Sequence, residues 1–276
     1  MLFRSSNKIS AKLSHELKNP DKTMFQDLQL AIHDGIATIT LNRPAVLNAL
    51  SPNLIGELGA ATRQVADDES VRVLIVTGAG RAWSAGVDLK ALNDSIQGGH
   101  FSNFSVMELG AAFIETLQTM PQVTIAMVNG HCYTGATEFM LAFDLVYAAD
   151  EAKIGDTHAK WGIAPKWGMT QRLAHKVGLS KAMELSFTTQ PVSGQEAERI
   201  GLVNKSVPLA DLETTVLAAA EQIKGNSAQT IAAMKKLYYF GATHTLAEGL
   251  KHEWEADVRI ADREEFLRGF QENKGK

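Results

Sequence analysis

The folded part of the chain begins with two short runs in which apolar and polar residues alternate. The runs LQLAIH and IATITLN flank Asp34-Gly35, a dipeptide that favours a type I′ turn, so residues 25–42 are predicted to form a β-hairpin. A helix then begins with Ser51 as its cap and Pro52 in its first turn, and it is expected to end before the acidic loop DDES.

Two longer apolar runs predict the centre of a sheet. VRVLIVT at residues 71–77 and VTIAMV at residues 123–128 are rich in β-branched residues, and their continuous apolar character is typical of strands buried on both faces. A helix at about residues 106–120 separates them, and a strand–helix–strand order indicates parallel neighbours. The Gly-rich loops after both strands therefore meet at one sheet edge, where α/β proteins bind ligands.

The second half of the chain is mostly helical. DLVYAAD predicts one more strand, residues 152–172 form a polar and aromatic connection, and the helical pattern that follows is interrupted by the short strand LVNKSV. We expect a basic, disordered leader over residues 1–24, a core over 25–205 and a helical oligomerisation segment over 206–276. The last helices carry more apolar residues than a free monomer favours, and oligomer contacts would cover them.

Composition is that of an ordinary globular protein and excludes several classes of function. Of the 276 residues, 45% are hydrophobic and 21% are charged. The net charge is −4 and no basic stripe runs through the body, which argues against nucleic acid as a partner. The single cysteine, Cys132, excludes an internal disulfide framework and a CxxC metal site. No apolar run approaches the roughly 20 residues of a membrane helix.

The first 24 residues differ from the rest, because lysines and serines are mixed there with few acids. We interpret this segment as a disordered or vector-derived leader. A mitochondrial transit peptide is the alternative, although the segment holds one arginine, Arg4, and no secretory apolar region. The protein is expected inside the cell, in the cytoplasm, or in mitochondria if the leader is a transit peptide.

The stretch after residue 128 carries the candidate chemistry. Thr134, Gly135 and Ala136 precede an apolar run that can start a helix, and backbone N–H groups at a helix entrance favour negative charge. Glu138, one turn in, would point a carboxylate at the same place. Backbone donors beside a carboxylate suit acyl chemistry. The alternative is that Gly135 permits close packing and Glu138 only complements the helix dipole.

An ordered series of motifs covers most of the chain. The series is LNRPxxLNAL at 41–50, VRVLIVTG followed by WSAGVDLK at 83–90, VNG and GATE within 128–138, an Asp- and Ala-containing region at 144–152, GIxP at 162–165, TQRL at 170–173 and AxxIGLV at 197–203. Over about residues 25–275 this order and spacing resembles the crotonase (enoyl-CoA hydratase/isomerase) superfamily.

The resemblance implies an α/β fold, a crotonase-like spiral of ββα units with a C-terminal helical extension, assembled as a homotrimer or homohexamer. It implies an acyl-CoA thioester as the ligand and no cofactor, since coenzyme A is part of the substrate. The thioester oxygen would lie between the backbone N–H groups of Val87 and Gly135. Enolate charge develops on that oxygen, and losing one such donor typically costs about 3–4 kcal/mol.

The resemblance also implies positions for coenzyme A. The candidates are Arg43, Ala45, Val46, Leu47, Ala85, Lys90 and Lys274. Ala45 stands where the family often has lysine, so phosphate contacts would come partly from elsewhere, such as Lys274 of a neighbouring subunit. A solvated surface role is the alternative for Arg43 and Lys90, and Asp88 belongs to the loop structure in this family.

One departure from the family pattern matters most. Hydratases of this superfamily use two glutamates, of which the first matches Glu138, whereas His158 stands in the place of the second. Because the ordinary pKa of histidine is about 6.5, His158 could act as acid or hold the water while Glu138 acts as base. Alternatively His158 lines the pocket, and a charged imidazole would weaken Glu138 as a base. Asp156 could orient the ring, but its direction is not readable from sequence.

The leading hypothesis is a lyase that hydrates 2-enoyl-CoA thioesters. Alternatives are an isomerase, decarboxylase or thioester hydrolase that uses Glu138 alone, or a non-catalytic CoA-thioester-binding protein. Trp161, Lys166 and Trp167 replace smaller residues common in hydratases, so they either reshape the acyl pocket or serve packing. A serine hydrolase is disfavoured because AWSAG lacks the first glycine of a nucleophile elbow, and a dinucleotide-binding dehydrogenase because GAG has no third glycine.

Overall fold

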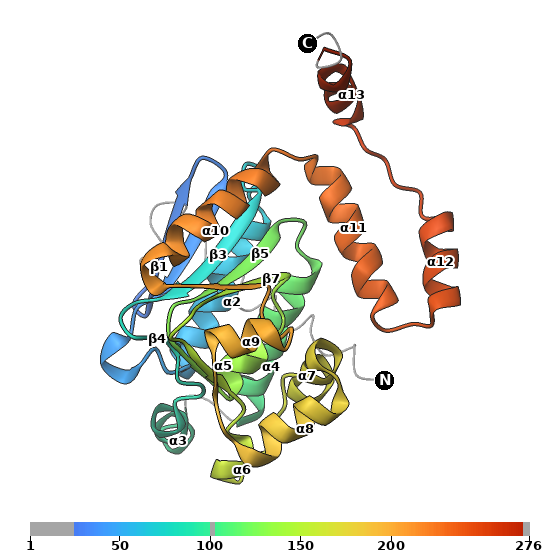
Figure 1. The fold of residues 1–276 in the computed structure, drawn as a ribbon. Helices are drawn as coiled ribbons and strands as arrows, with labels where there is room; N and C mark the ends of the chain where they lie inside the picture. The colour runs from blue at the N-terminus through green and yellow to red at the C-terminus, as the bar shows by residue number, and fades with distance from the viewer. Residues whose placement is uncertain (1–24, 100–102, 273–276) are drawn as a thin grey trace.

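A six-stranded sheet forms the centre of the molecule (Figure 1). The computed structural model describes residues 25–99 and 103–272, so the leader at residues 1–24 lies outside the described residues. The sheet has the strand order β1-β2-β3-β5-β7-β10, in which β1 and β2 are antiparallel and all other neighbours are parallel. Its strands are β1 (Leu28–His33), β2 (Ile36–Leu41), β3 (Val73–Gly78), β5 (Val123–Val128), β7 (Leu145–Ala149) and β10 (Lys205–Val207).

The N-terminal hairpin has the turn that its sequence predicts. His33 pairs with Ile36 across the turn, and both Asp34 (φ 46°) and Gly35 (φ 75°) adopt left-handed backbone conformations, as a type I′ turn requires. The predicted parallel pairing of β3 with β5 is also confirmed, since Val73 pairs with Val123.

A second sheet of very short strands lies beside the first. Its order is β4-β6-β8-β9, and each of the first three follows a strand of the main sheet along the chain. The sequence did not predict it, because two or three residues are too few to show a period. Strand pairs followed by a helix, repeated along the chain, give the α/β spiral of ββα units. The strands are β4 (Ala82–Ser84), β6 (His131–Tyr133), β8 (Lys153–Gly155) and β9 (Val192–Ser193).

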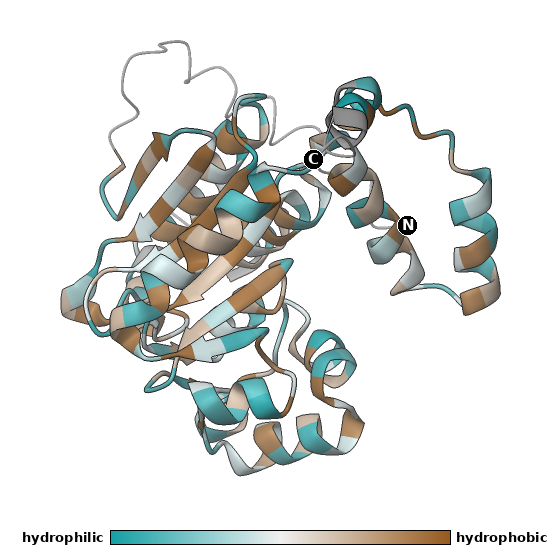
Figure 2. Ribbon diagram, turned by 45° about the horizontal axis from the view of Figure 1, so that its top comes forward, coloured by the Kyte–Doolittle hydropathy of each residue, from teal (hydrophilic) through white to brown (hydrophobic). Residues whose placement is uncertain are grey.

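Helices lie against both sheets. Helices α2 and α4 contact each other, and α10 contacts β3, β5 and β7. Apolar residues run along the strands between these helices (Figure 2). Within α2, Ser51 Oγ accepts a hydrogen bond from Leu54 N, which confirms the predicted cap. The helical segments are η1 (Pro44–Val46), α2 (Pro52–Ala66), α3 (Leu89–Gln97), α4 (Asn103–Thr119), α5 (Gly135–Met140), α6 (His158–Trp161), α7 (Met169–Val177), α8 (Leu179–Thr188), α9 (Gly194–Arg199) and α10 (Leu209–Lys224).

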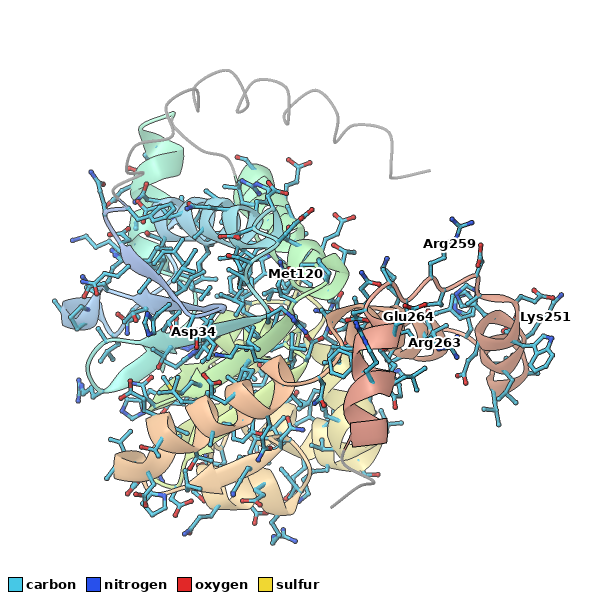
Figure 3. The ribbon with its side chains drawn as sticks, turned by 90° about the horizontal axis from the view of Figure 1, so that it is seen from above. Asp34, Met120, Lys251, Arg259, Arg263 and Glu264 are labelled. Carbon is cyan, nitrogen blue, oxygen red and sulfur yellow. The ribbon has the colours of Figure 1, made fainter. Side chains whose placement is uncertain are left out.

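The C-terminal helices leave the body as an arm. In Figure 3 the arm with Lys251 and Arg259 stands apart from the body that holds Asp34 and Met120. The arm consists of α11 (Ala228–Gly241), α12 (Leu246–Glu255) and α13 (Arg263–Glu272). In the described part of the chain, no helix has the length and apolar character that crossing a membrane demands.

A buried ion pair anchors α11 to the body. Lys235 Nζ donates to Asp144 Oδ2 at 2.8 Å and to the carbonyl oxygens of Leu117 and Gln122 at 2.8 and 3.0 Å. Tyr239 OH donates to the other oxygen of Asp144 at 3.0 Å. Because the ammonium group is buried and all three of its donors have acceptors, this contact fixes where the arm starts.

Candidate active site

The segments that follow β4 and β6 lie side by side. A Cβ atom placed on Gly86 would lie 2.7 Å from Tyr133 O and 3.5 Å from Gly135 N, and one on Gly135 would lie 3.1 Å from Val87 Cγ2. The parallel pairing of β4 with β6 produces this approach. It brings together Val87 and Gly135, the two predicted oxyanion donors.

Within residues 25–99 and 103–272, no hydrogen bond occupies the backbone N–H of Val87 or of Gly135. The parallel bridge between Leu50 and Val87 uses the neighbours of Val87, since Leu50 N donates to Gly86 O and Asp88 N donates to Leu50 O. Gly135 is the first residue of α5, so its N–H has no acceptor inside the helix. Two adjacent donors of this kind can bind an anionic oxygen.

Thr134, the cap of α5, has a strained backbone. Its φ of 55° and ψ of −117° lie in a region that residues with a side chain rarely occupy, at a cost on the order of 1–3 kcal/mol. The surroundings hold it there: Thr134 N donates to Gly155 O at 3.0 Å, and its hydroxyl bonds that of Thr157. Strain of this kind concentrates at functional sites, and here it sets the direction in which α5 begins.

Glu138 presents a fixed carboxylate one turn into α5. The residue is 2% exposed, and its Oε1 accepts hydrogen bonds from the backbone N–H groups of Trp167 and Met169 at 2.8 and 3.2 Å. Its other oxygen, Oε2, lies 3.4 Å from Nε2 of His158. One oxygen is therefore held by the protein, while the second faces the imidazole.

The imidazole of His158 is held from its other side by Asp156. His158 Nδ1 lies 2.6 Å from Asp156 Oδ1, which also accepts from His158 N at 3.0 Å. Asp156 Oδ2 accepts from the hydroxyl of Ser186 at 2.7 Å. The structure thus settles the orientation that the sequence left open. A continuous series of side-chain contacts therefore runs from Ser186 through Asp156 and His158 to Glu138.

The negative charges of Asp156 and Glu138 keep the imidazole of His158 protonated. Burial works to lower the pKa of His158, but the hydrogen bonds and negative charges of Asp156 and Glu138 outweigh it and raise that pKa to about 9. Burial likewise works to raise the pKa of Asp156, and the hydrogen bonds from His158 and Ser186 outweigh it and hold that pKa below its ordinary value. At neutral pH the site holds an imidazolium between two carboxylates.

Comparison with known proteins gives the family. The family model described as enoyl-CoA hydratase/isomerase matches residues 31–276. The chain belongs to the enoyl-CoA hydratase/isomerase family, a family of enzymes. It is 34% identical over 242 residues to a probable mitochondrial enoyl-CoA hydratase of Dictyostelium discoideum, which covers 87% of this chain and 86% of the relative.

Solved structures of two kinds of enzyme resemble this one. An enoyl-CoA hydratase from Bacillus anthracis superposes with a TM-score of 0.82 at 32% identity, over 90% of this chain and 97% of that one. A monofunctional enoyl-CoA isomerase from M. smegmatis superposes with a TM-score of 0.71 at 30% identity, over 84% of this chain and 99% of that one. The fold predicted from the motifs is therefore confirmed.

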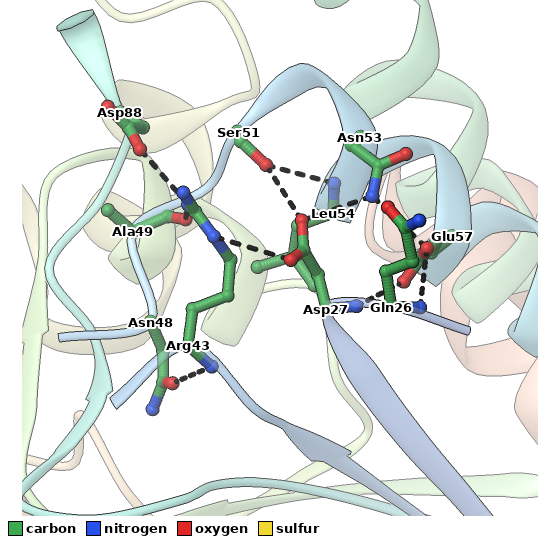
Figure 4. A network of polar contacts seen from close by, with 10 residues as sticks. All are labelled: Gln26, Asp27, Arg43, Asn48, Ala49, Ser51, Asn53, Leu54, Glu57 and Asp88. Carbon is green, nitrogen blue, oxygen red and sulfur yellow. Dashed lines mark hydrogen bonds and ion pairs between the residues drawn. The ribbon is translucent and has the colours of Figure 1, made fainter. Parts of the chain in front are cut away.

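Arg43, a candidate for CoA in this family, is held by internal contacts (Figure 4). Its Nη1 donates to Asp88 Oδ2 at 3.0 Å and to Ala49 O at 2.5 Å, and its Nε lies 3.6 Å from Asp27 Oδ1. Asp88 Oδ1 also accepts from Ala91 N at 3.0 Å, at the start of α3. Arg43 thus joins the loop after β2 to Asp88, the residue that follows the predicted donor Val87.

The remaining CoA candidates lie near the same loops. Leu47 O accepts a hydrogen bond from Ala85 N at 2.9 Å, so these two candidates are neighbours. Ala85 precedes Val87 by two residues. Ala45 and Val46 are exposed in η1, and Lys90 is exposed on α3. Lys274 lies outside the described residues.

Several contacts of the site could not be found from sequence, although Trp167 itself stood out by its size. Trp167 and Met169 hold Glu138 with their backbone N–H groups, which any residue supplies and no motif reveals. Ser186 reaches Asp156 from α8, whose apolar pattern indicates a helix but not this partner.

Proposed function

We propose that this enzyme hydrates 2-enoyl-CoA thioesters, with Glu138 as the general base and His158 as the general acid. The observation that carries the proposal is the contact of 3.4 Å between Glu138 Oε2 and His158 Nε2, beside two free backbone donors. A group that takes a proton and a group that holds one therefore lie in contact. Addition of water needs both, because one proton leaves the water and another is added to the α-carbon.

The steps follow from these positions. The thioester oxygen accepts hydrogen bonds from the N–H groups of Val87 and Gly135. Glu138 removes a proton from water as the water oxygen bonds to the β-carbon, and the electrons of the double bond move toward the thioester oxygen as an enolate. His158 Nε2 then gives its proton to the α-carbon. Each oxyanion donor contributes about 3–4 kcal/mol to the stabilisation of the enolate.

The ion pair also explains how the site returns to its starting state. After one turnover Glu138 is protonated and His158 is neutral. A proton passing from Glu138 to Nε2 restores both groups without exchange with solvent, since the two side chains are already in contact.

An isomerase is the second candidate, because a solved isomerase is among the structural relatives. An isomerase that used Glu138 alone would not need a protonated second group. The held and protonated His158 therefore favours hydration over that reaction. The proposed reaction uses no cofactor beyond the coenzyme A of the substrate. We propose that the protein lies in the cytoplasm, or in mitochondria if residues 1–24 are a targeting segment.

A hydration assay tests the proposal. Crotonyl-CoA is incubated with wild type, Glu138→Gln, His158→Gln and the control His175→Gln, which removes an exposed histidine on α7. We expect loss of the conjugated ultraviolet absorbance with wild type and the control, and a decrease of about 10²–10⁴-fold in each site variant. Binding of crotonyl-CoA by wild type without loss of absorbance would refute hydration and leave the isomerase or a non-catalytic binding protein.

For the assembly we infer a homotrimer or homohexamer. Leu246, Leu250 and Trp254 form one apolar face of α12 and are 80%, 60% and 90% exposed. The face is unfavourable in water, and its spacing of four residues is that of one helix side. Leu179, Met183 and Phe187 expose a second apolar face with the same spacing on α8. Two different apolar faces on one chain suit a closed ring of identical subunits.

A further inference from the structure

Trp167 fills the space between α4 and the start of α5. The side chain is 4% exposed, and its Nε1 donates to Met107 O on α4 at 3.0 Å. On its other side the ring packs against Phe139 of α5, with 4.7 Å between ring centroids and 37° between the planes. The indole is therefore held from two sides, by a hydrogen bond to one helix and by a tilted ring contact with another.

Two glycines make room for this indole. A Cβ on Gly110 would lie 2.3 Å from Cε2 of Trp167, and one on Gly135 would lie 2.9 Å from Cζ3. Carbon atoms do not approach so closely without displacement, so the indole occupies volume that side chains at both positions would otherwise fill. The tryptophan and the two glycines form one packed unit.

This unit touches both parts of the proposed reaction. The backbone N–H of Trp167 holds Glu138 Oε1 at 2.8 Å, while its ring lies against Gly135, a proposed donor to the thioester oxygen. In the proposed reaction the reacting carbons of the acyl group lie between Glu138 and that oxygen. The carbon atoms of the acyl chain that follow the reacting carbons would then reach the indole of Trp167.

We propose that Trp167 is a specificity-determining residue that restricts the substrate to short acyl groups such as crotonyl. The proposal rests on the proposed function, because it assumes that the acyl group lies between Glu138 and Gly135. The indole acts as a rigid wall, since its hydrogen bond to Met107 O and its ring contact with Phe139 hold it in place. Long acyl chains would have to displace it from between α4 and α5.

The test compares chain lengths in wild type, Trp167→Leu and Trp167→Ala. Values of kcat/KM are measured with crotonyl-CoA and 2-octenoyl-CoA. We expect wild type to prefer crotonyl-CoA by about 100-fold or more, and the variants to reduce that preference at least about tenfold. Trp167→Leu keeps an apolar group in the space and the backbone N–H to Glu138, so it serves if Trp167→Ala does not fold. Equal activity of wild type on both substrates, or equal losses in the variants, would overturn the proposal.

A matched control and a binding measurement complete the design. Trp161→Ala removes a tryptophan that is 60% exposed on α6 and should leave the preference for chain length unchanged. Affinities for butyryl-CoA and octanoyl-CoA are measured by calorimetry. Their difference shows whether Trp167 limits the length of the acyl group, independently of turnover. One outcome is that hydration fails while wild type binds butyryl-CoA more tightly than octanoyl-CoA and Trp167→Leu removes that difference. In that case the proposed reaction is wrong, and the restriction of chain length by Trp167 is supported. If wild type binds both equally, the wall is refuted.

Discussion

His158 Nε2 lies 3.4 Å from Glu138 Oε2, while its Nδ1 lies 2.6 Å from Asp156. A histidine between two buried carboxylates keeps its proton at neutral pH, and its pKa is raised to about 9. A histidine in the place of a glutamate is therefore compatible with an acid role. Asp156 at Nδ1 and Glu138 at Nε2 together make it so, because both outweigh the effect of burial on the pKa of His158.

Replacing Asp156 with asparagine should move the pH dependence of the reaction. Without the carboxylate the pKa of His158 falls, so the decline of kcat/KM at alkaline pH should begin at lower pH than in wild type. The measurement is kcat/KM for crotonyl-CoA between about pH 6 and about pH 10. If Asp156→Asn lowered the rate equally at every pH, Asp156 would have only a structural role.

The same ion pairs make stability depend on pH. The pKa of His158 rises from 6.5 to about 9 on folding, so its stabilisation is fully present below pH 6.5 and is lost as pH rises through about 9. Relative to His158→Gln, wild type should lose on the order of 3 kcal/mol of its free energy of unfolding across this window. Urea unfolding of both proteins at about pH 6 and about pH 9.5 measures the difference. Parallel changes in the two proteins would contradict the raised pKa.

Replacing Lys235 with methionine should destabilise the protein. Asp144, whose side chain is 16% exposed, would lose its ammonium partner, and breaking a buried pair costs about 3–5 kcal/mol. Tyr239 and Thr124 still donate to Asp144, so we expect a value near the lower limit. Thermal unfolding compares Lys235→Met with Lys236→Met, whose side chain is exposed on the same helix. Equal melting temperatures in the two variants would show that the pair contributes little.

The apolar face of α12 should control the assembly. Sedimentation of wild type should give the mass of a trimer or hexamer, and a Leu250→Ser, Trp254→Ser double variant should give smaller species. Lys251→Ser, on the polar side of the same helix, is the control and should leave the mass unchanged. A monomeric wild type would contradict the claim that this face forms a contact between subunits.

Local patterns predicted much of the fold. The turn at Asp34 and Gly35, the cap at Ser51 and the parallel strands β3 and β5 each follow from a few adjacent residues, and the structure has all of them. The second sheet was missed because its strands are too short to show alternation. Helix α3, directly after Asp88, was also missed inside a loop that reads as glycine-rich.

The site was only partly readable for a related reason. Glu138 stands out by its place one turn after Gly135, and His158 by the resemblance to the family, in which its position holds a glutamate; the structure brings the two together. The contacts that fix them come from segments distant in sequence, such as the N–H of Trp167 and the hydroxyl of Ser186. Sequence shows which groups are present, whereas tertiary packing decides which of them meet.

The central claim is that a protonated His158 gives the proton to the α-carbon. The most direct measurement is kcat/KM for crotonyl-CoA hydration by wild type as a function of pH. The account predicts activity that persists through neutral pH and falls as the pH passes about 9, where His158 loses its proton. Activity that instead increases as the imidazole becomes neutral would contradict the account, because His158 would then act as a base or not at all.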